Sequence, residues 1–570
     1  MATNINRRCG TGPRALSLLG VIMTMTLVAG MLAATAAASP ASDESDAQRN
    51  QKLVKAGPMT PQKAKLLGKT NIDFGPNCDT ATGRVKLPSV YAPPCVEPFK
   101  GKNGGATSEG VTGDEIKLVV YVADPAKDPL LAAQIRLAGA NLDIPEIENT
   151  FRGYVDIYNK LFELYGRKIS VEFFVGTGSG ADTTAAKADA IAIADKKPFA
   201  VLGAPQQSTT VFSDELASRG VLCVGFCAAA VPQKIVERNA GYIFPVAQSP
   251  EEGAELTAEL IGKQAGPGKA QHAGDPAIQA KNRVYGVAHY DTPDGQYQGL
   301  FTTLKDKLKK YKITPKVDQS FFLDPAKLQE NARTIITKMK DAGVTTVIYT
   351  GDPLTPASLT KEATAQDYFP EWIIGPTYLA DTSIFGRTYD QSQWEHAFGI
   401  GLVPGRAQKE LSGTWFLYDW FHGTPPPSNI YGVINPGVYI FARGVMLAGP
   451  KLTPKTFRDG LFRYPPSGGD PVNPQQSWGK HGVWPFIDYY EADDAALIWW
   501  DPTAPGEDEA SNNGTGLYRY ADGGKRYTLG HFPAKGQAGL FDTAASATIF
   551  QQQLPPESTP PSYPSPAAGG

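Results

Sequence analysis

Residues 199–225 read FAVLGAPQQSTTVFSDELASRGVLCVG, and this stretch decides the fold. Two short apolar runs, residues 199–203 and 220–225, flank a segment at residues 208–218 that is expected to be helical. Strands that are continuously apolar, rather than alternating, are typical of parallel sheets with helices on both faces. The stretch therefore predicts a strand–helix–strand unit of an α/β protein.

The same alternation continues in both directions along the chain and forms two series. The first series adds strands at residues 116–122 and 168–175 and helices at residues 150–167 and 182–195. The second series comprises strands at residues 283–290, 318–323 and 344–350 and helices at residues 254–263, 296–311 and 326–342. Because each series can form its own covered parallel sheet, the sequence predicts two lobes.

The remaining segments connect or extend these series. Residues 241–249 and 371–378 are extended and lack helical periodicity, so they are interpreted as crossovers between the lobes. Later helices are expected at residues 412–421, 436–448 and 453–462. Residues 551–570 are rich in Pro and Ser, a composition that predicts a disordered tail.

The N-terminus has the pattern of an export signal. Arg7, Arg8 and Arg14 precede an uncharged stretch, and no acidic residue occurs before Asp43. Residues 36–38 are all Ala, a small-residue pattern that a signal peptidase accepts. We therefore expect a cleaved signal peptide over residues 1–38 and an exported protein at the cell surface, in the periplasm or secreted. An uncleaved membrane anchor is the alternative.

Charge and cysteine content agree with export. The formal net charge is -3, and removal of three arginines with the signal would make the chain more acidic, which gives no reason to expect a nucleic-acid partner. Four cysteines would remain, Cys78, Cys95, Cys223 and Cys227, and an even number in an oxidising compartment indicates two disulfides. Three pairings are possible, of which proximity favours Cys78–Cys95 and Cys223–Cys227. Neither pair has the spacing or the histidines of a zinc site.

Five segments in this order resemble type I periplasmic binding proteins, most of all the branched-chain amino-acid-binding (leucine-binding-like) group. These segments are residues 112–122 (TGDEIKLVVYV), 151–175, 199–224, 242–249 and 284–299. The resemblance extends from about residue 110 to residue 502 and implies two Rossmann-like lobes joined by three crossovers. It also implies a small-molecule solute as ligand and an ABC permease in the membrane as partner.

On this basis the chain is divided into consecutive segments. The expected division is a signal peptide (1–38), a linker with a disulfide-stapled extension (39–110), lobe 1 (111–245), lobe 2 (246–375), a return to lobe 1 (376–465), a return to lobe 2 with the C-terminal region (466–535), and the disordered tail (551–570).

The first candidate site lies in the loop between residues 203 and 209. In parallel α/β sheets, ligands bind beyond the carboxyl ends of the strands, where helix N-termini favour an anionic group such as a carboxylate. Ser208 and Thr209 offer hydroxyls at such a helix start, and Gln206 and Gln207 offer amides. Ser208 can also serve as the helix cap, and the two roles are compatible.

Further candidates follow other strands. Phe226, with Cys227 beside it, stands where members of the resembled family commonly have small hydroxyl residues, so this chain departs from a plain amino-acid site. Tyr290 and Asp291 follow the first strand of the second series; Asp291 could pair with an amino group or favour the helix start. Asp352 and Tyr378 are the remaining ligand candidates.

The sequence lacks complete catalytic, cofactor and metal-binding motifs. Residues 176–181 (GTGSGA) match a dinucleotide-binding turn, but the strand that should supply the ribose-binding acid ends in Leu202-Gly203. The six histidines form no metal-ligand spacing, and no G-x-S-x-G nucleophile motif occurs. We therefore expect no enzyme activity, no cofactor and no bound metal.

These observations lead to two expected functions. The first is the substrate-binding component of an ABC importer for an amino acid, an amide or a similar small organic solute. The second is a ligand-sensing, receptor-like protein of the same fold without a transport role.

Overall fold

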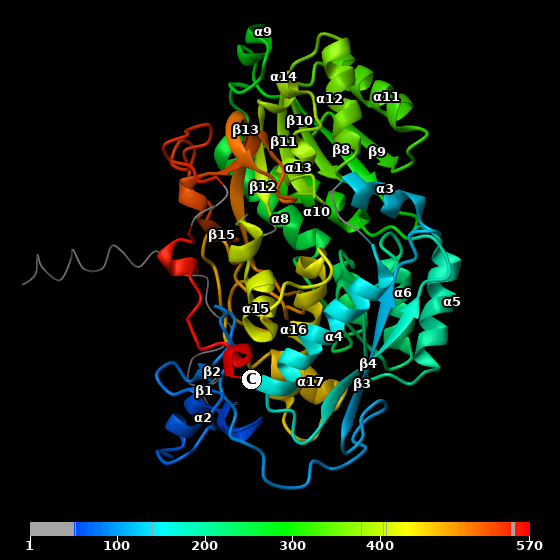
Figure 1. Cartoon of the computed structure of the whole chain (residues 1–570). Coiled ribbons are helices and arrows are strands. Elements are labelled where there is room, and N and C mark those ends of the chain that lie inside the picture. Colours follow the sequence, from blue (N-terminus) through cyan, green and yellow to red (C-terminus); the bar gives the residue numbers. More distant parts are fainter. Residues whose placement is uncertain are drawn as a thin grey trace, which may run out of the picture.

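Two separate β-sheets, one in each of two lobes, organise the chain (Figure 1). The computed structural model describes residues 51, 53–137, 142–377, 379–402, 404–405, 407–548 and 553–569. The predicted signal peptide, residues 1–38, lies outside the described residues. The two-lobed α/β fold that the sequence predicted is confirmed.

The sheet of lobe 1 is entirely parallel, with the strand order β4-β3-β5-β6-β7. Its strands are β3 (Glu115–Val122), β4 (Lys168–Val175), β5 (Ala200–Leu202), β6 (Leu222–Gly225) and β7 (Ile243–Pro245). Every residue of β5 and β6 is buried. This burial explains the two apolar runs, because helices cover both faces of the sheet.

The helices of lobe 1 lie on opposite sides of this sheet (Figure 1). The helix α16 packs against α4, α17 and β6, whereas α6 packs against α5 and β6. The bounds are α3 (Pro129–Leu137), α4 (Ile144–Leu161), α5 (Thr183–Ala194), α6 (Thr209–Ser218), α7 (Gln233–Arg238), α15 (Gly413–His422), α16 (Tyr431–Ala448) and α17 (Pro454–Leu461). The helix α4 begins six residues before the predicted start, because the Asp143 side chain caps it by accepting from the Glu146 N–H.

The sheet of lobe 2 combines parallel and antiparallel strands in the order β14-β13-β12-β11-β10-β8-β9, with β15 paired to β13. Its strands are β8 (Tyr285–Asp291), β9 (Val317–Phe322), β10 (Thr346–Gly351), β11 (Glu371–Thr377), β12 (Ala397–Gly401), β13 (Asp494–Glu507), β14 (Asn513–Tyr520) and β15 (Arg526–Thr528). The strands from β8 to β12 pair in parallel. The late strands β13, β14 and β15 add an antiparallel edge that the sequence did not predict.

The helices of lobe 2 cover its sheet on both faces, and two buried cores result. The helix α8 packs against α10, β11 and β12, and α11 packs against α12 and β9. The bounds are α8 (Pro250–Leu260), α9 (Pro276–Gln279), α10 (Gln298–Lys309), α11 (Leu328–Asp341), α12 (Thr355–Ala365), α13 (Ser383–Gly386) and α14 (Gln391–Trp394), and a π-helical turn (Ile261–Ala265) extends α8. None of the described helices is long and apolar enough to cross a lipid bilayer.

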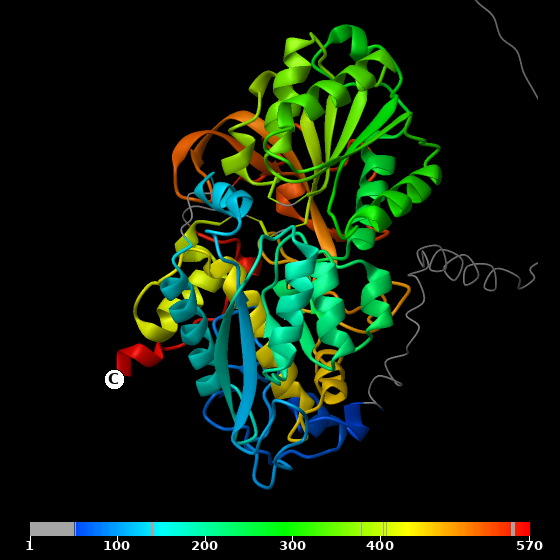
Figure 2. The ribbon, with the colours of Figure 1, turned by 90° about the vertical axis from the view of Figure 1, so that its right-hand side faces the viewer.

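Three crossovers connect the lobes (Figure 2). They join β7 to α8, β12 to α15, and α17 to β13. The interpretation of residues 371–378 as a crossover was wrong, because β11 is an internal strand paired with both β10 and β12. The chain therefore leaves the lobe 2 sheet only after β12, later than the expected boundary at residue 375.

Both terminal extensions pack on the lobes. The N-terminal extension contains α2 (Pro61–Leu66), β1 (Cys78–Asp79) and β2 (Arg84–Val85), and a disulfide joins Cys78 to Cys95. We expected residues 551–570 to be disordered, but the structure places residues 553–569 along the surface. Tyr563 packs on the lobe 1 core, its carbonyl accepts from the Trp420 indole N–H at 2.9 Å, and Ser558 donates to Asp470 at 2.5 Å. A Pro-rich segment whose only regular structure is two short 3-10 helices, η5 (Pro556–Ser558) and η6 (Pro566–Gly569), is thus held by side-chain contacts.

Candidate functional site

The candidate site lies where loops from the carboxyl ends of the two sheets meet. In lobe 1 these are the loops that follow β5 and β6, and in lobe 2 it is the loop that follows β8. Hydrogen bonds join the lobes here, from Thr210 of lobe 1 to Asp294 of lobe 2 and from Gln296 of lobe 2 to Thr209 of lobe 1. This is the place at which α/β sheets bind ligands.

The loop after β5 depends on Gly203. This residue has φ +74°, and a Cβ atom at this position would lie 2.3 Å from the Tyr121 carbonyl oxygen. Only glycine combines the left-handed conformation with so close an approach of two backbone segments. The chain can therefore turn sharply from β5 toward the start of α6.

Ser208 lies at the start of α6 but does not cap it. Its side chain is fully buried, and its hydroxyl donates to the Gly180 carbonyl at 2.8 Å. The Gln207 N–H donates to the same carbonyl at 3.1 Å. Ser208 thus ties the loop after β5 to the glycine-rich loop before α5, and its hydroxyl is engaged within the chain.

The other candidates of this loop differ in their exposure. Thr209 is 1% exposed, and its hydroxyl donates to the Ala229 carbonyl at 2.7 Å, which joins the loops after β5 and β6. Gln206 and Gln207 are partly exposed at the lobe surface. Their side-chain amides are the groups of this loop that a solute could reach with the least rearrangement.

The loop after β6 is constrained by a disulfide. Phe226 opens the short helix η1 (Phe226–Ala228) and is partly exposed, and Cys227 is bonded to Cys223 of β6. Gly225 has φ +66°, and a Cβ there would lie 2.5 Å from the Gly437 Cα of α16. The disulfide and this contact hold the backbone that presents the Phe226 ring.

Tyr290 and Asp291 end β8 on the lobe 2 side. Tyr290 is 7% exposed, and its ring lies 5.5 Å from that of Tyr297. Burial is the main cause that raises the Tyr290 pKa, with further contributions from Tyr297 and from nearby carboxylates. Asp291 is partly exposed and accepts a hydrogen bond from the Thr292 N–H at 2.8 Å. Tyr290 is therefore packed among aromatic rings of lobe 2, and Asp291 is the more exposed residue at the end of β8.

Asp352 stabilises the loop before α12. One of its oxygens accepts from the N–H groups of Leu354 and Thr355, both at 2.8 Å, and the other accepts from the Thr355 hydroxyl at 2.7 Å. The side chain is 3% exposed, and burial raises its pKa despite these bonds. Both oxygens of Asp352 are thus engaged inside lobe 2. Tyr378 lies outside the described residues.

Two residues of the site, Asp294 and Gln296, were missed by the sequence analysis. Both lie in the turn 292–296 (TPDGQ) between β8 and α10. Pro and Gly mark this segment as a turn, and that signal could have placed it at the carboxyl end of β8. Its contact with α6 depends on how the two lobes meet, which no local pattern encodes.

In the glycine-rich loop at residues 176–181, backbone N–H groups already donate hydrogen bonds to carboxylates of the chain itself. Asp189 accepts from the N–H and the hydroxyl of Thr177 at 2.9 and 2.6 Å, and Asp128 accepts from the Gly180 N–H at 2.7 Å. These N–H groups are the ones that a dinucleotide pyrophosphate would need. Across the residues the structure describes, no cluster of three or more His, Cys, Asp or Glu side chains could hold a metal ion.

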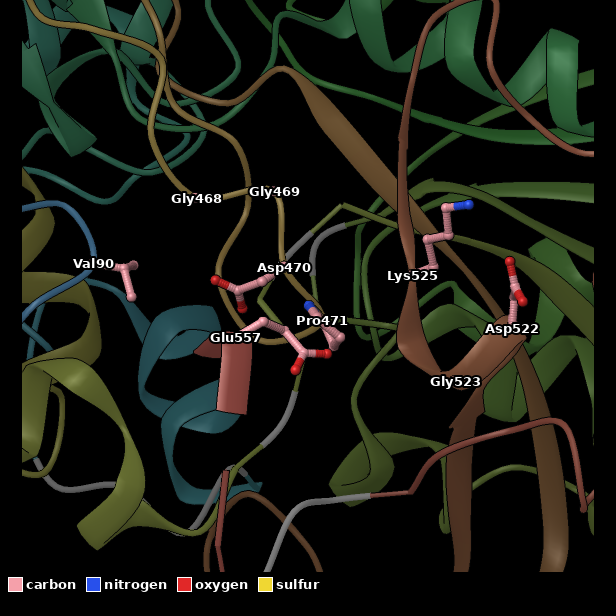
Figure 3. A pocket seen from close by; sticks show the side chains of 9 residues that line it. All are labelled: Val90, Gly468, Gly469, Asp470, Pro471, Asp522, Gly523, Lys525 and Glu557. Atoms are coloured by element: carbon pink, nitrogen blue, oxygen red, sulfur yellow. The ribbon is translucent and has the colours of Figure 1, made fainter. Parts of the chain in front are cut away.

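A cavity of about 670 Å³ lies elsewhere, beside the terminal extensions (Figure 3). Its lining residues are Val90, Gly468, Gly469, Asp470, Pro471, Asp522, Gly523, Lys525 and Glu557. The Asp470 carboxylate is already held by N–H groups of Val472 and Asn473 at 3.0 Å. The cavity contains none of the candidate residues between the lobes, and we do not assign it to the candidate site.

Comparison with known proteins gives one family match. The sequence model described as "Periplasmic binding protein" matches residues 143–475, more than half of the 570 residues. No curated protein sequence matches the chain significantly.

Among solved structures, an amino acid ABC transporter substrate-binding protein from Pseudomonas fluorescens Pf-5 is 11% identical, with a TM-score of 0.48 over 75% of this chain and 98% of that chain. A branched-chain amino acid transporter substrate-binding protein from Streptococcus pneumoniae, in complex with isoleucine, is 12% identical, with a TM-score of 0.46 over 71% and 100%. An ABC transporter solute-binding protein from Rhodopseudomonas palustris HaA2, in complex with p-hydroxybenzoic acid, is 10% identical, with a TM-score of 0.48 over 73% and 98%.

Proposed function

The chain belongs to the periplasmic binding protein family, and on that premise we propose that it is the substrate-binding component of an ABC importer. Its solute is an amino acid, an amide or a similar small organic molecule. The protein is exported, and its partner is a membrane permease. As a member of this family the chain is a binding protein and not an enzyme.

The observation that supports this function best is the junction of the two lobes. The loops after β5, β6 and β8 lie at the carboxyl ends of their strands, and hydrogen bonds across the lobes connect the start of α6, which follows β5, with the turn after β8. A solute held between such loops contacts both lobes, so its binding energy favours the closed arrangement. The closed form then presents a surface that the open form lacks, and a permease can recognise this surface.

Side chains of both lobes suit a small polar solute with an apolar part. The Phe226 ring and the Tyr290 phenol supply apolar surface, whereas the amides of Gln206 and Gln207 and the Asp291 carboxylate supply polar groups. Binding sites of this kind combine aromatic walls with a few polar groups that fix orientation. We assign these five residues to solute contact.

A thermal-shift screen tests the function. Amino acids, their amides and aromatic acids are added singly, and one chemical class should raise the melting temperature in a saturable way. A ligand at about 100 times its Kd stabilises the folded state by about 2.7 kcal/mol. The Gln207→Ala variant should lose that rise, whereas Gln366→Ala, on the far side of lobe 2 at the end of α12, should keep it.

The screen would contradict the proposal if no compound shifted the melting temperature. A shift without any interaction between the liganded protein and a permease of its own cell envelope would instead favour the ligand-sensing role.

A further inference from the structure

The C-terminal segment connects the two lobes a further time, in addition to the three crossovers. Residues 541–548 lie on lobe 2, and residues 553–569 continue to lobe 1 (Figure 1, red end of the colour scale). Residues 549–552, which join these two parts, lie outside the described residues. The five steps from residue 548 to residue 553 can span at most about 18 Å, because an extended chain covers about 3.6 Å per residue. The two parts are therefore closely tethered.

The first part is fixed to the sheet of lobe 2. Ala547 pairs with Tyr520 of β14 in an antiparallel bridge, in which the two N–H groups donate to the facing carbonyls at 2.9 and 2.7 Å. The Trp499 indole N–H of β13 donates to the Ser546 hydroxyl at 3.0 Å, and the Phe541 ring lies 5.3 Å from the Trp499 ring. This part must therefore move with lobe 2.

The second part is fixed to lobe 1, where Tyr563 packs on the core. The Trp420 indole N–H of α15 donates to the Tyr563 carbonyl at 2.9 Å, and the Ser565 hydroxyl donates to the Trp420 carbonyl at 2.5 Å. The Tyr563 hydroxyl donates to Asp79 at 3.1 Å, in strand β1 of the disulfide-stapled extension. This part must therefore move with lobe 1.

Between these ends, the segment also contacts the third crossover. Ser558 is 1% exposed, and its hydroxyl donates to Oδ1 of Asp470, which lies between α17 and β13. The same oxygen accepts from the N–H groups of Val472 and Asn473, both at 3.0 Å. A single carboxylate thus joins the C-terminal segment to the backbone of the crossover.

We propose that the C-terminal segment, residues 541–569, is a strap that limits the relative motion of the two lobes. A large hinge motion would carry its two fixed ends apart, and the short link between them cannot lengthen to follow. Such a motion must then break the bridge on lobe 2 or the contacts of Tyr563 on lobe 1. The strap follows from the two-lobed fold and does not depend on which solute the protein binds.

Double electron–electron resonance between spin labels on the two lobes tests the strap. The labels are placed at Lys187→Cys in α5 and Lys309→Cys in α10, whose side chains are 58% and 65% exposed. Four of the five native cysteines form disulfides, and Cys9→Ser removes the fifth. All samples are extensively dialysed, so that they are compared in the same buffer.

Two variants release the tether in different ways. One inserts a flexible Gly/Ser segment after Gln551, which lengthens the link and keeps the contacts at both ends. The other ends the chain after Thr548, which removes the lobe 1 end. The matched control inserts the same Gly/Ser segment after Gly536, an exposed lobe 2 residue before the strap where a Cβ would meet nothing within 4 Å.

Both variants should broaden the distribution of label distances and add distances that the wild type and the control do not sample. An unchanged distribution in the lengthened variant would overturn the strap. Broadening in the truncated variant alone would also overturn it, because the cause would then be lost packing on lobe 1 and not a released tether. None of these outcomes bears on solute binding, so the proposed function is judged separately by the thermal-shift screen.

Discussion

At the scale of single residues, several polar side chains of the site form hydrogen bonds with backbone groups of the chain itself. Ser208 donates to the Gly180 carbonyl, Thr209 donates to the Ala229 carbonyl, and Asp352 accepts from the Thr355 N–H at the start of α12. Each has a residue type and a position that also suit a ligand contact, which is why the sequence indicated them. What the sequence could not show was how much of their hydrogen-bonding capacity the chain itself uses.

Gly203 and Gly220 allow a residue-scale prediction with a matched control. Both have positive φ, +74° and +79°, but a Cβ at Gly203 would collide with the Tyr121 carbonyl, whereas nothing lies within 4 Å of a Cβ at Gly220. Gly220→Ala should therefore cost about 1 kcal/mol from backbone strain alone. Gly203→Ala should cost at least about 2 kcal/mol more, because the loop must move.

Urea unfolding at pH 7 measures both variants. Equal losses of stability would show that the loop after β5 is not held against Tyr121.

At the scale of elements, buried carboxylates lie in or next to two of the crossovers between the lobes. Glu252 lies in the first turn of α8, just after the first crossover, and Asp488 and Asp493 lie in the third crossover. All three are buried, and each has one oxygen without a hydrogen-bond partner among the described residues. Their charged neighbours are held separately, with Arg443 paired to Glu491 and Arg526 paired to Asp494.

Burial raises the pKa of Glu252 to about 8 and that of Asp493 to about 7, and burial with the nearby Glu252 raises the Asp488 pKa. In the unfolded chain these groups titrate near pH 4. The folded state therefore binds more protons between about pH 4 and pH 8, and its stability should fall as the pH rises through that window. Each such group contributes up to about 1.4 kcal/mol per pH unit.

Urea unfolding at intervals from pH 5 to pH 8.5 checks this dependence. Glu252→Gln should make the profile flatter, since Gln keeps the hydrogen bond from Ser249 and cannot ionise. The matched control is Glu557→Gln, at an exposed residue of the C-terminal tail, which should keep the wild-type profile. A stability that rises with pH in the wild type would contradict the burial of these carboxylates.

At the scale of the whole molecule, the sequence correctly predicted the strands and helices that have a local, periodic pattern of apolar residues. The strands at β3, β4, β8 and β10 and the helices α5, α6, α10 and α11 lie within a few residues of their predicted bounds, because apolar runs and helical spacing report burial directly. Residues 371–377 were misinterpreted, since a buried strand and an extended crossover look alike until strand pairing is known. The contact of Asp294 with α6 could not be predicted, because it joins residues of two lobes.

The central claim is that the two lobes hold one small solute between them. Native mass spectrometry of the protein purified from its own cells, followed by denaturation, tests this most directly. The account predicts one small organic molecule per chain that is released on denaturation. It also predicts that a Tyr290→Ala variant that remains folded carries no such molecule. A protein that carries no small molecule, and gains none when the compounds of the thermal-shift screen are added, would contradict it.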